Sequence, residues 1–408
     1  MFDAQIVRNE FPMLVAGDKE PKPLAFLDST ATTQKPESVI EVMNQFYREH
    51  YSSVKRGVYR LSARTTEAFE ETRKNIAKFI NAQTEDEIVF TRGTTESINL
   101  VAYSFGLKFF EASDEILISG LEHHANIVSW QIVAQIRGAK IKVIPVKDNG
   151  ELDIETLPSL LTDKTKMVAV AHVSNAVGTV NPIKEIISIV RNNAPQAKVL
   201  IDAAQSSSHL KIDVQDLDTD FLVFSGHKMY GPTGIGVLYG KYNVLDSMPP
   251  WHGGGEMIKK VTFEKTTYAD VPARFEAGTP AIAEVLGLGA AIKWIEKTGL
   301  ENIHNHEKEI TEYALNELQK IPQVHVLGNP KNRGALISIT IDGIAVSDAA
   351  MILDEENVAV RSGHHCAEPV MERFNVDATL RLSFGAYTLK KDIDRFITGI
   401  KRVIKLFA

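Results

Sequence analysis

The sequence predicts an α/β protein with two domains, a large one built on a largely parallel β-sheet and a smaller α+β domain at the C-terminal end. At 408 residues the chain is too long for one ordinary compact core. Up to about residue 240, short apolar runs alternate with helical patterns, which is typical of a parallel sheet with helical crossovers. Beyond about residue 280, strands become fewer and helical patterns longer.

The apolar runs of the first region are the candidate strands of the large domain. Several are nearly continuous in apolar residues, as strands covered on both faces must be. They lie at 24–28, 87–91, 115–119, 141–146, 166–172, 198–204, 220–226 and 235–240. Helical patterns separate many of them, for example at 95–110 and 182–193.

The rest of the chain predicts the smaller α+β domain. A helical stretch covers roughly 283–320, and it is followed by candidate strands and helices at 324–328, 335–341, 347–356, 357–361, 379–384 and a final amphipathic helix. We therefore expect a large domain at 16–290 and a small domain at 291–408, with residues 1–15 packing on the small one.

Composition excludes several classes of protein. The formal charge of -7 and the absence of a Lys/Arg cluster argue against a nucleic-acid binder. No run of about 18 apolar residues suggests a membrane helix, and the N-terminus is not typical of a secretory signal. The single cysteine, Cys366, cannot form an internal disulfide. Together these features predict a cytoplasmic protein.

Polar side chains follow five of the candidate strands. Ligands of open α/β sheets bind beyond the carboxyl ends of the strands. In chain order, the polar residues at these ends include Thr94, Thr95, Glu122, His123, Asn175, Asp202, Gln205, Ser225, His227 and Lys228. Five such ends together predict one shared site.

Two of these strand ends suggest parts of a ligand. Thr94 and Thr95 lie where a helix should begin, and its free N–H groups would favour a phosphate, although an ordinary threonine N-cap is an alternative. Asp202 ends an apolar run, so its carboxylate must be paired if it is buried. A pyridinium nitrogen would be a suitable partner, and a helix cap is the other interpretation.

The segment SGHKMYGPTGIG around Lys228 is the most specific. Lys228 follows an apolar strand among small residues, and burial beside other cations would make its amine nucleophilic. The glycines would let the backbone pass close to a ligand. A surface lysine in a turn is the alternative.

His123 could stack on a planar cofactor. A structural histidine, or a metal ligand together with His124, is the alternative. The run His364, His365 and Cys366 could also suggest a metal site, but adjacent residues seldom both reach one ion, and zinc-binding spacings are absent. We therefore expect no metal.

Two further residues of the C-terminal region are candidate functional residues. Cys366 is expected on a loop, where His364, His365 and Arg361 could favour its thiolate. Arg381 lies inside an apolar strand and needs an anionic partner, either a substrate carboxylate or a structural salt bridge.

These segments together resemble the aminotransferase class V family of fold-type-I pyridoxal-phosphate (PLP) enzymes. Within it, they are most similar to the group II cysteine desulfurases of the SufS type. The matching segments are LDSTATTQKP, FTRGTTESINLVA, EHHANIV, HVSNAVGT, IDAAQ, FSGHKMYGPTGIG, RFEAGTP and VRSGHHCAEP. The segment VRSGHHCAEP distinguishes group II from group I, because group I relatives have a longer loop around their cysteine.

The resemblance implies a homodimer, a mostly parallel seven-stranded sheet in the large domain, and PLP held by Lys228 as a Schiff base. It implies that His123 stacks on the pyridine ring, Asp202 pairs with the ring nitrogen and Gln205 contacts the phenolic oxygen. The implied phosphate ligands are Thr94, Thr95, Ser225, His227 and, across the dimer, Thr279 of the partner subunit. The implied ligands of the substrate carboxylate are Asn175 and Arg381, with Arg361 close by.

The resemblance also implies a reaction. L-Cysteine would become L-alanine through the catalytic groups Lys228, His123 and Cys366, leaving a persulfide on Cys366. The sulfur would pass to an acceptor protein of the SufE or SufU type for iron–sulfur cluster assembly. The alternatives are a selenocysteine lyase, a class V transaminase or lyase in which Cys366 is incidental, and a PLP-holding scaffold without turnover.

Three positions depart from the family pattern. Lys55 replaces a common histidine, Thr388 replaces a common asparagine, and Ser347 stands where members that use a zinc-containing acceptor often have histidine. These departures leave the acceptor and the loop details open.

Overall fold

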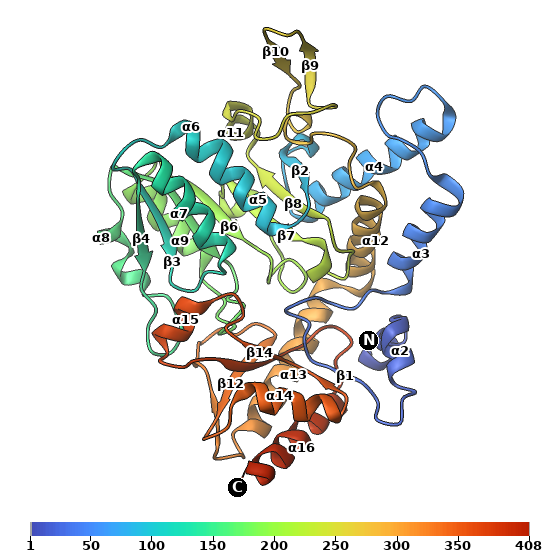
Figure 1. Cartoon of the computed structure of the whole chain (residues 1–408), viewed down its shortest axis with the longest axis vertical. Helices are drawn as coiled ribbons and strands as arrows, with labels where there is room; N and C mark the ends of the chain where they lie inside the picture. Colours follow the sequence, from blue (N-terminus) through green and yellow to red (C-terminus); the bar gives the residue numbers. More distant parts are fainter. Residues whose placement is uncertain (1, 408) are drawn as a thin grey trace.

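A seven-stranded sheet forms the centre of the large domain in the computed structural model, which describes residues 2–407 (Figure 1). The strand order is β2-β8-β7-β6-β5-β3-β4. The bounds are β2 (Ile88–Thr91), β3 (Glu115–Ser119), β4 (Lys140–Ile144), β5 (Thr165–Ala171), β6 (Lys198–Asp202), β7 (Phe221–Ser225) and β8 (Gly236–Gly240). All neighbours are parallel except β8, which is antiparallel to both β2 and β7. The predicted mostly parallel α/β sheet is confirmed.

Helices cover both faces of this sheet, which explains the nearly continuous apolar runs. Successive residues of a strand point to opposite faces. Ile116 and Ile118 of β3 pack with Trp130 of α7 on one face, whereas Leu117 packs with Ile186 of α9 on the other. The helices of the large domain are α3 (Glu37–Gln45), α4 (Arg60–Phe79), α5 (Thr94–Val101), α6 (Leu107–Phe109), α7 (Ala125–Arg137), α8 (Leu157–Leu160), α9 (Ile183–Asn193), α10 (Val214–Leu217), α11 (Tyr242–Ser247) and α12 (Ile282–Thr298).

The run at 24–28 does not join the large sheet, so its interpretation as a strand of that sheet is wrong. Only β1 (Ala25–Phe26) forms there, and it pairs with β13 (Val358–Ala359). Ala25 and Leu27 are buried in the core of the small domain with Ile337 and Leu382. The apolar run therefore fills a different core from the one that its pattern suggested.

The small domain lies below the large one in Figure 1. Its antiparallel sheet has four strands in the order β11-β12-β15-β14. They are β11 (Val324–Val326), β12 (Leu336–Ile341), β14 (Arg361–Gly363) and β15 (Thr379–Ser383). Its helices are α13 (Leu300–Leu318), α14 (Val346–Glu355), α15 (Glu368–Arg373) and α16 (Lys390–Phe407).

The helical stretch and the domain boundary expected between the two domains differ from those in the structure. The helical stretch at 283–320 is two helices, because Gly299 (φ 88°) separates α12 from α13. The expected boundary at residue 290 lies inside α12, which packs against α3 and α4 of the large domain.

The N-terminal helices α1 (Ala4–Arg8) and α2 (Pro12–Gly17) contact both domains. Buried Arg8 forms ion pairs with Asp18 (2.8 Å) and with Asp392 at the start of α16 (3.2 Å). Phe11 packs edge-on against Trp294 of α12. The N-terminal segment thus contacts the last helix of the large domain as well as the small domain.

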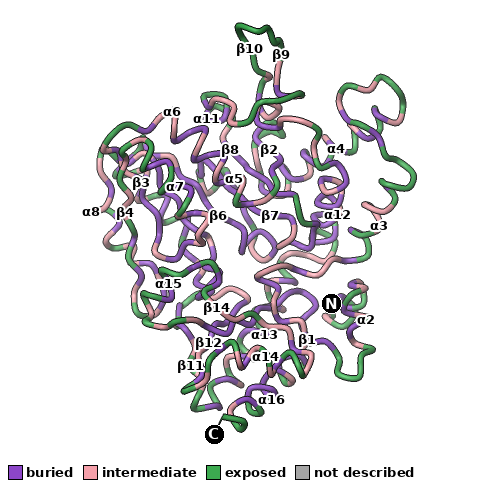
Figure 2. The backbone as a smooth tube through the Cα atoms, viewed as in Figure 1, coloured by how far each residue is buried: buried purple, intermediate pink, exposed green. Residues whose placement is uncertain are grey.

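A hairpin of β9 (Ile258–Val261) and β10 (Thr266–Tyr268) projects from the large domain at the top of Figure 1. Figure 2 shows that much of it is exposed, and Val261, Phe263 and Tyr268 are exposed large apolar side chains there. Within residues 2–407, none of the helices combines the length and apolarity that crossing a membrane requires.

Candidate active site

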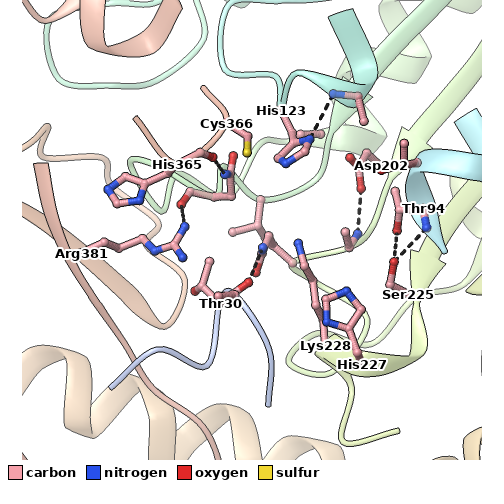
Figure 3. A pocket seen from close by; sticks show the side chains of 18 of the residues that line it. Thr30, Thr94, His123, Asp202, Ser225, His227, Lys228, His365, Cys366 and Arg381 are labelled. Atoms are coloured by element: carbon pink, nitrogen blue, oxygen red, sulfur yellow. Dashed lines mark hydrogen bonds between the residues drawn. The ribbon is translucent and has the colours of Figure 1, made fainter. Parts of the chain in front are cut away.

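A cavity of roughly 230 Å³ lies between the carboxyl ends of the large sheet and the small domain (Figure 3). Most of the predicted site residues line it, namely Thr94, Thr95, His123, Asn175, Asp202, Gln205, Ser225, His227, Lys228, Arg361, Cys366 and Arg381. Thr279 does not line the cavity of its own chain and is exposed in the loop before α12. The structure therefore brings the strand ends of the large domain together with Arg361, Cys366 and Arg381 of the small domain.

Lys228 lies in a short turn that follows β7. The pKa of its amine is lowered to about 8, mainly by burial; Asp202 opposes this effect, and the cations Arg381 and Arg361 add to it. A substantial fraction of the amine is therefore neutral near physiological pH, and the neutral form is the nucleophile that a Schiff base requires.

Asp202 ends β6 at the base of the cavity. Burial raises the pKa of its carboxyl, and its Oδ1 accepts a hydrogen bond from the N–H of Ala204 (2.9 Å). Among residues 2–407, no lysine or arginine forms an ion pair with it. A buried carboxyl without a cationic partner suits a protonated ring nitrogen, which would supply the missing charge.

His123 presents a neutral imidazole to the cavity. Its Nδ1 accepts a hydrogen bond from the N–H of Ala125 (3.1 Å), so the proton of the neutral ring is on Nε2. Burial lowers its pKa to about 4, and the nearby Lys228 cation adds to the effect. In Figure 3 the ring lies between Cys366 and Asp202.

Glu122 anchors the turn that carries His123, a role that sequence reasoning missed. Its buried carboxyl accepts hydrogen bonds from the N–H of Ala171 (2.8 Å), from Asn126 Nδ2 (2.6 Å) and from the Ser119 hydroxyl. Burial raises its pKa to about 8. The sequence shows that Glu122 precedes His123, but it does not show that Glu122 bonds to residues of β3, β5 and α7.

The start of α5 forms a small cradle at the other end of the cavity. Ser225 Oγ accepts a hydrogen bond from the N–H of Thr94 (2.8 Å) and also bonds the Thr94 hydroxyl (2.8 Å). A side chain on Gly236 would overlap the backbone of Gly93, which adopts φ 154° immediately before the helix. Backbone N–H groups at a helix start, with hydroxyls beside them, are typical of a phosphate site.

The chemical groups of this cavity fit the functional groups of PLP. The Lys228 amine suits the aldehyde, the Asp202 carboxyl suits the ring nitrogen, and the Thr94–Ser225 cradle suits the phosphate. Within residues 2–407, no group of three or more His, Cys, Asp or Glu side chains is arranged to hold a metal ion.

Two arginines face each other at the small-domain side of the cavity. Arg361 on β14 and Arg381 on β15 are direct partners in the strand register. Arg381 is 2% exposed, donates to the carbonyl of Asn175 (2.9 Å), and lies 3.4 Å from Asp28. Its buried Nε has no partner among the described residues. Like charges opposite each other on a sheet are unfavourable, so the pair is suited to a bound anion such as a substrate carboxylate.

Asp28 and Thr30 are site residues that the sequence interpretation left without roles. Thr30 lines the cavity, and its carbonyl accepts a hydrogen bond from Gln205 Nε2 (3.0 Å). Asp28 ends the apolar run at 24–28 and Thr30 follows it, and this position was the available signal, since the other site residues also lie at the ends of apolar runs.

Cys366 is exposed on the loop between β14 and α15, so its predicted loop position is confirmed. His365 and Cys366 have φ values of 55° and 54°, a left-handed conformation that is unusual for two consecutive non-glycine residues. The carbonyl of His365 accepts from Asn175 Nδ2 (2.6 Å), and the carbonyl of Cys366 accepts from the N–H of His124 (2.7 Å). The large domain thus holds this loop from both carbonyls.

The three departures from the family pattern lie outside the cavity lining. Lys55 Nζ lies 3.4 Å from Glu276, three positions before Thr279 in the chain. The Thr388 hydroxyl accepts from the N–H of Gly385 (3.0 Å), and Ser347 is exposed on α14.

Comparisons with known proteins agree with this geometry. The family model described as aminotransferase class-V matches residues 25–396. A cysteine desulfurase of Escherichia coli K12 is 46% identical and covers 100% of this chain and 99% of its own, and one of Pectobacterium carotovorum is 47% identical over 98% of both chains. The crystal structure of the cysteine desulfurase CsdA from Escherichia coli has a TM-score of 0.92 at 37% identity, covering 100% of this chain and 99% of its own. An apo cysteine desulfurase of Thermococcus onnurineus has a TM-score of 0.93 at 37% identity over 99% of both chains.

The match of the family model, the full-length relatives and the arrangement of Lys228, Asp202 and His123 lead to one conclusion: the chain belongs to the aminotransferase class V family.

Proposed function

We propose that this protein is a PLP-dependent cysteine desulfurase of the group II (SufS) type. The observation that carries the proposal is that the chain's only cysteine opens into the same cavity as Lys228 and the Arg361–Arg381 pair. An amino acid whose carboxylate is bound by the arginines would lie within this cavity, between the lysine and the thiol. The full-length relatives named cysteine desulfurases support the same reaction.

The site residues have different roles in the proposed reaction. Bound PLP supplies an electron sink for the α-carbon of the amino acid. Arg381, Arg361 and Asn175 orient the substrate carboxylate. The Lys228 amine moves the proton at the α-carbon, since its pKa of about 8 lets it both accept and donate near neutral pH. His123, whose proton is on Nε2, holds or donates a proton at the thiol side of the cavity.

Cys366 completes the reaction. Its sulfur forms an S–S bond to the substrate sulfur as the substrate C–S bond breaks, and the carbon skeleton gains a proton and leaves as L-alanine. L-Cysteine and the Cys366 thiol therefore give L-alanine and a Cys366 persulfide, with no external oxidant or reductant. The persulfide sulfur then passes to an acceptor protein of the SufE or SufU type for iron–sulfur cluster assembly in the cytoplasm.

The active form in this proposal is a homodimer in which Thr279 of the partner subunit reaches the phosphate. The exposed position of Thr279 outside its own cavity supports this arrangement. Exposed apolar side chains on the projecting hairpin and near α3 and α4, namely Val261, Phe263, Tyr47, Tyr51 and Val58, also suit a subunit interface.

Mixing two inactive variants tests the shared site. A heterodimer of K228A and T279E chains has one cavity with an intact Lys228 and, if Thr279 acts across the interface, an intact phosphate ligand. We expect each heterodimer to recover up to half of the activity of a wild-type dimer, while both homodimers in the mixture stay inactive. No recovery in heterodimers whose formation is confirmed by native mass spectrometry would contradict the arrangement.

Persulfide mapping on Cys366 tests the central claim. After incubation with L-cysteine, mass spectrometry should find one extra sulfur on the Cys366 peptide, and alanine should appear in equal amount during the first turnover. C366S should keep the absorption of bound PLP and lose sulfide release. Full sulfide release by C366S would overturn the persulfide mechanism, and transamination products in place of alanine would favour a class V transaminase.

A further inference from the structure

His124 contacts the Cys366 loop at two points, the carbonyl of Cys366 and the N–H of Glu368. Its backbone N–H donates to the carbonyl of Cys366 (2.7 Å), and its ring Nε2 accepts from the N–H of Glu368 (3.0 Å). His124 lies just before α7 and follows His123 directly. His123 lines the cavity, whereas His124 is not among the lining residues.

The loop needs external support for two reasons. His365 and Cys366 both adopt left-handed backbone conformations, which non-glycine residues keep only where the surroundings hold them. Glu368 is the first residue of α15, and N–H groups at a helix start have no partner within the helix. The residue before it, Ala367, has no side chain that could accept a hydrogen bond. The imidazole of His124 supplies the missing acceptor.

We propose that His124 is a positioning residue for Cys366: its imidazole holds the start of α15, and with it the loop conformation that points the thiol at the substrate. The inference rests on the proposed function and deepens it, because it assigns a residue that touches neither cofactor nor substrate to the sulfur-transfer half of the reaction. Because Nε2 accepts a hydrogen bond, the ring acts in its neutral form with the proton on Nδ1.

A matched pair of variants separates the acceptor from the bulk of the ring. Gln in H124Q places an amide oxygen near the position of Nε2, whereas Leu in H124L fills a similar volume without an acceptor. The first readout is hydrogen–deuterium exchange of the Glu368 amide, which does not depend on activity. The second is the rate of persulfide formation on Cys366. The third is exchange of the α-hydrogen of L-alanine with deuterium oxide, which requires Lys228 and PLP but not the thiol.

In H124L, we expect Glu368 amide exchange to be about tenfold faster and persulfide formation about tenfold slower, an effect within the range of one hydrogen bond. Alanine α-hydrogen exchange should stay within about twofold of wild type, because the Lys228 side of the cavity is unchanged. H124Q should keep all three rates near those of wild type. If leucine prevents folding, H124A removes the acceptor without adding volume and should give the H124L result.

Three outcomes would overturn the proposal. They are unchanged Glu368 exchange in H124L, persulfide formation at the wild-type rate, and equal losses in H124Q and H124L. An equal loss of alanine exchange would also count against it, because it would point to general damage to the site. Failure of the wild-type protein to form a persulfide would instead overturn the proposed function, while Glu368 exchange would still report whether His124 holds the loop.

Discussion

Replacing Glu276 with glutamine (E276Q) should destabilise the large domain strongly, because Glu276 and Arg73 form a buried ion pair. Glu276 Oε1 lies 2.7 Å from Arg73 Nη1, and Oε2 lies 3.0 Å from Nη2. The side chains are 5% and 2% exposed. Oε1 also accepts from the N–H of Phe90 (2.9 Å). Removing one charge of a buried pair typically costs about 3–5 kcal/mol. We expect a loss near the lower end, about 3 kcal/mol, because the glutamine oxygen still accepts a hydrogen bond.

The same arginine offers a matched control. Glu70 Oε2 lies 2.8 Å from Arg73 Nε, but the Glu70 side chain is 37% exposed. E70Q should therefore cost at most about 1 kcal/mol, as expected for a solvent-screened pair.

Urea unfolding of the PLP-free proteins, followed by both circular dichroism and tryptophan fluorescence, measures the two losses. Two probes are needed because a two-domain protein can unfold in steps. Equal losses in E276Q and E70Q, or a loss below about 1 kcal/mol in E276Q, would refute the argument from burial.

Two further predictions concern the cofactor site. The rate at which PLP-free protein binds PLP, followed by stopped-flow absorbance, should rise with pH around a midpoint of about 8, because only the neutral Lys228 amine reacts. A midpoint near the ordinary lysine pKa of 10.5 would contradict a buried Lys228 amine with a lowered pKa. G236A should weaken PLP binding roughly tenfold, because the added methyl group overlaps the backbone of Gly93 and such overpacking costs about 1–3 kcal/mol. G253A, where the new Cβ meets nothing within 4 Å, should bind PLP normally in the same equilibrium dialysis.

The large sheet and most of the site were predictable because their signals are local. A strand buried on both faces needs a continuous apolar run, and polar residues directly after such runs lie at one edge of the sheet. Lys228 and Asp202 were found in this way. Cys366 was placed on its loop because an apolar strand ends before it and a glycine follows that strand, and the family resemblance supplied its role.

What the sequence did not reveal depends on contacts between distant residues. The run at 24–28 has the pattern of a large-sheet strand, but Ala25 and Leu27 pack in the small-domain core. The Arg73–Glu276 pair joins residues 203 positions apart, and no periodicity predicts such a contact. The left-handed backbone at His365 and Cys366 is likewise fixed by hydrogen bonds from Asn175, in a turn after β5, and His124, in the turn before α7.

The exposed thiol of Cys366 has a further consequence, because the chain contains no other cysteine. No second thiol in the same subunit can receive the sulfur or form a protective disulfide. In the proposed reaction each subunit therefore stores one sulfur atom at most, and its next turnover waits for another molecule to remove it. Because Cys366 is the only cysteine, an oxidised Cys366 has no second thiol in its own chain with which to form a disulfide. Its reduction therefore depends on external reductants.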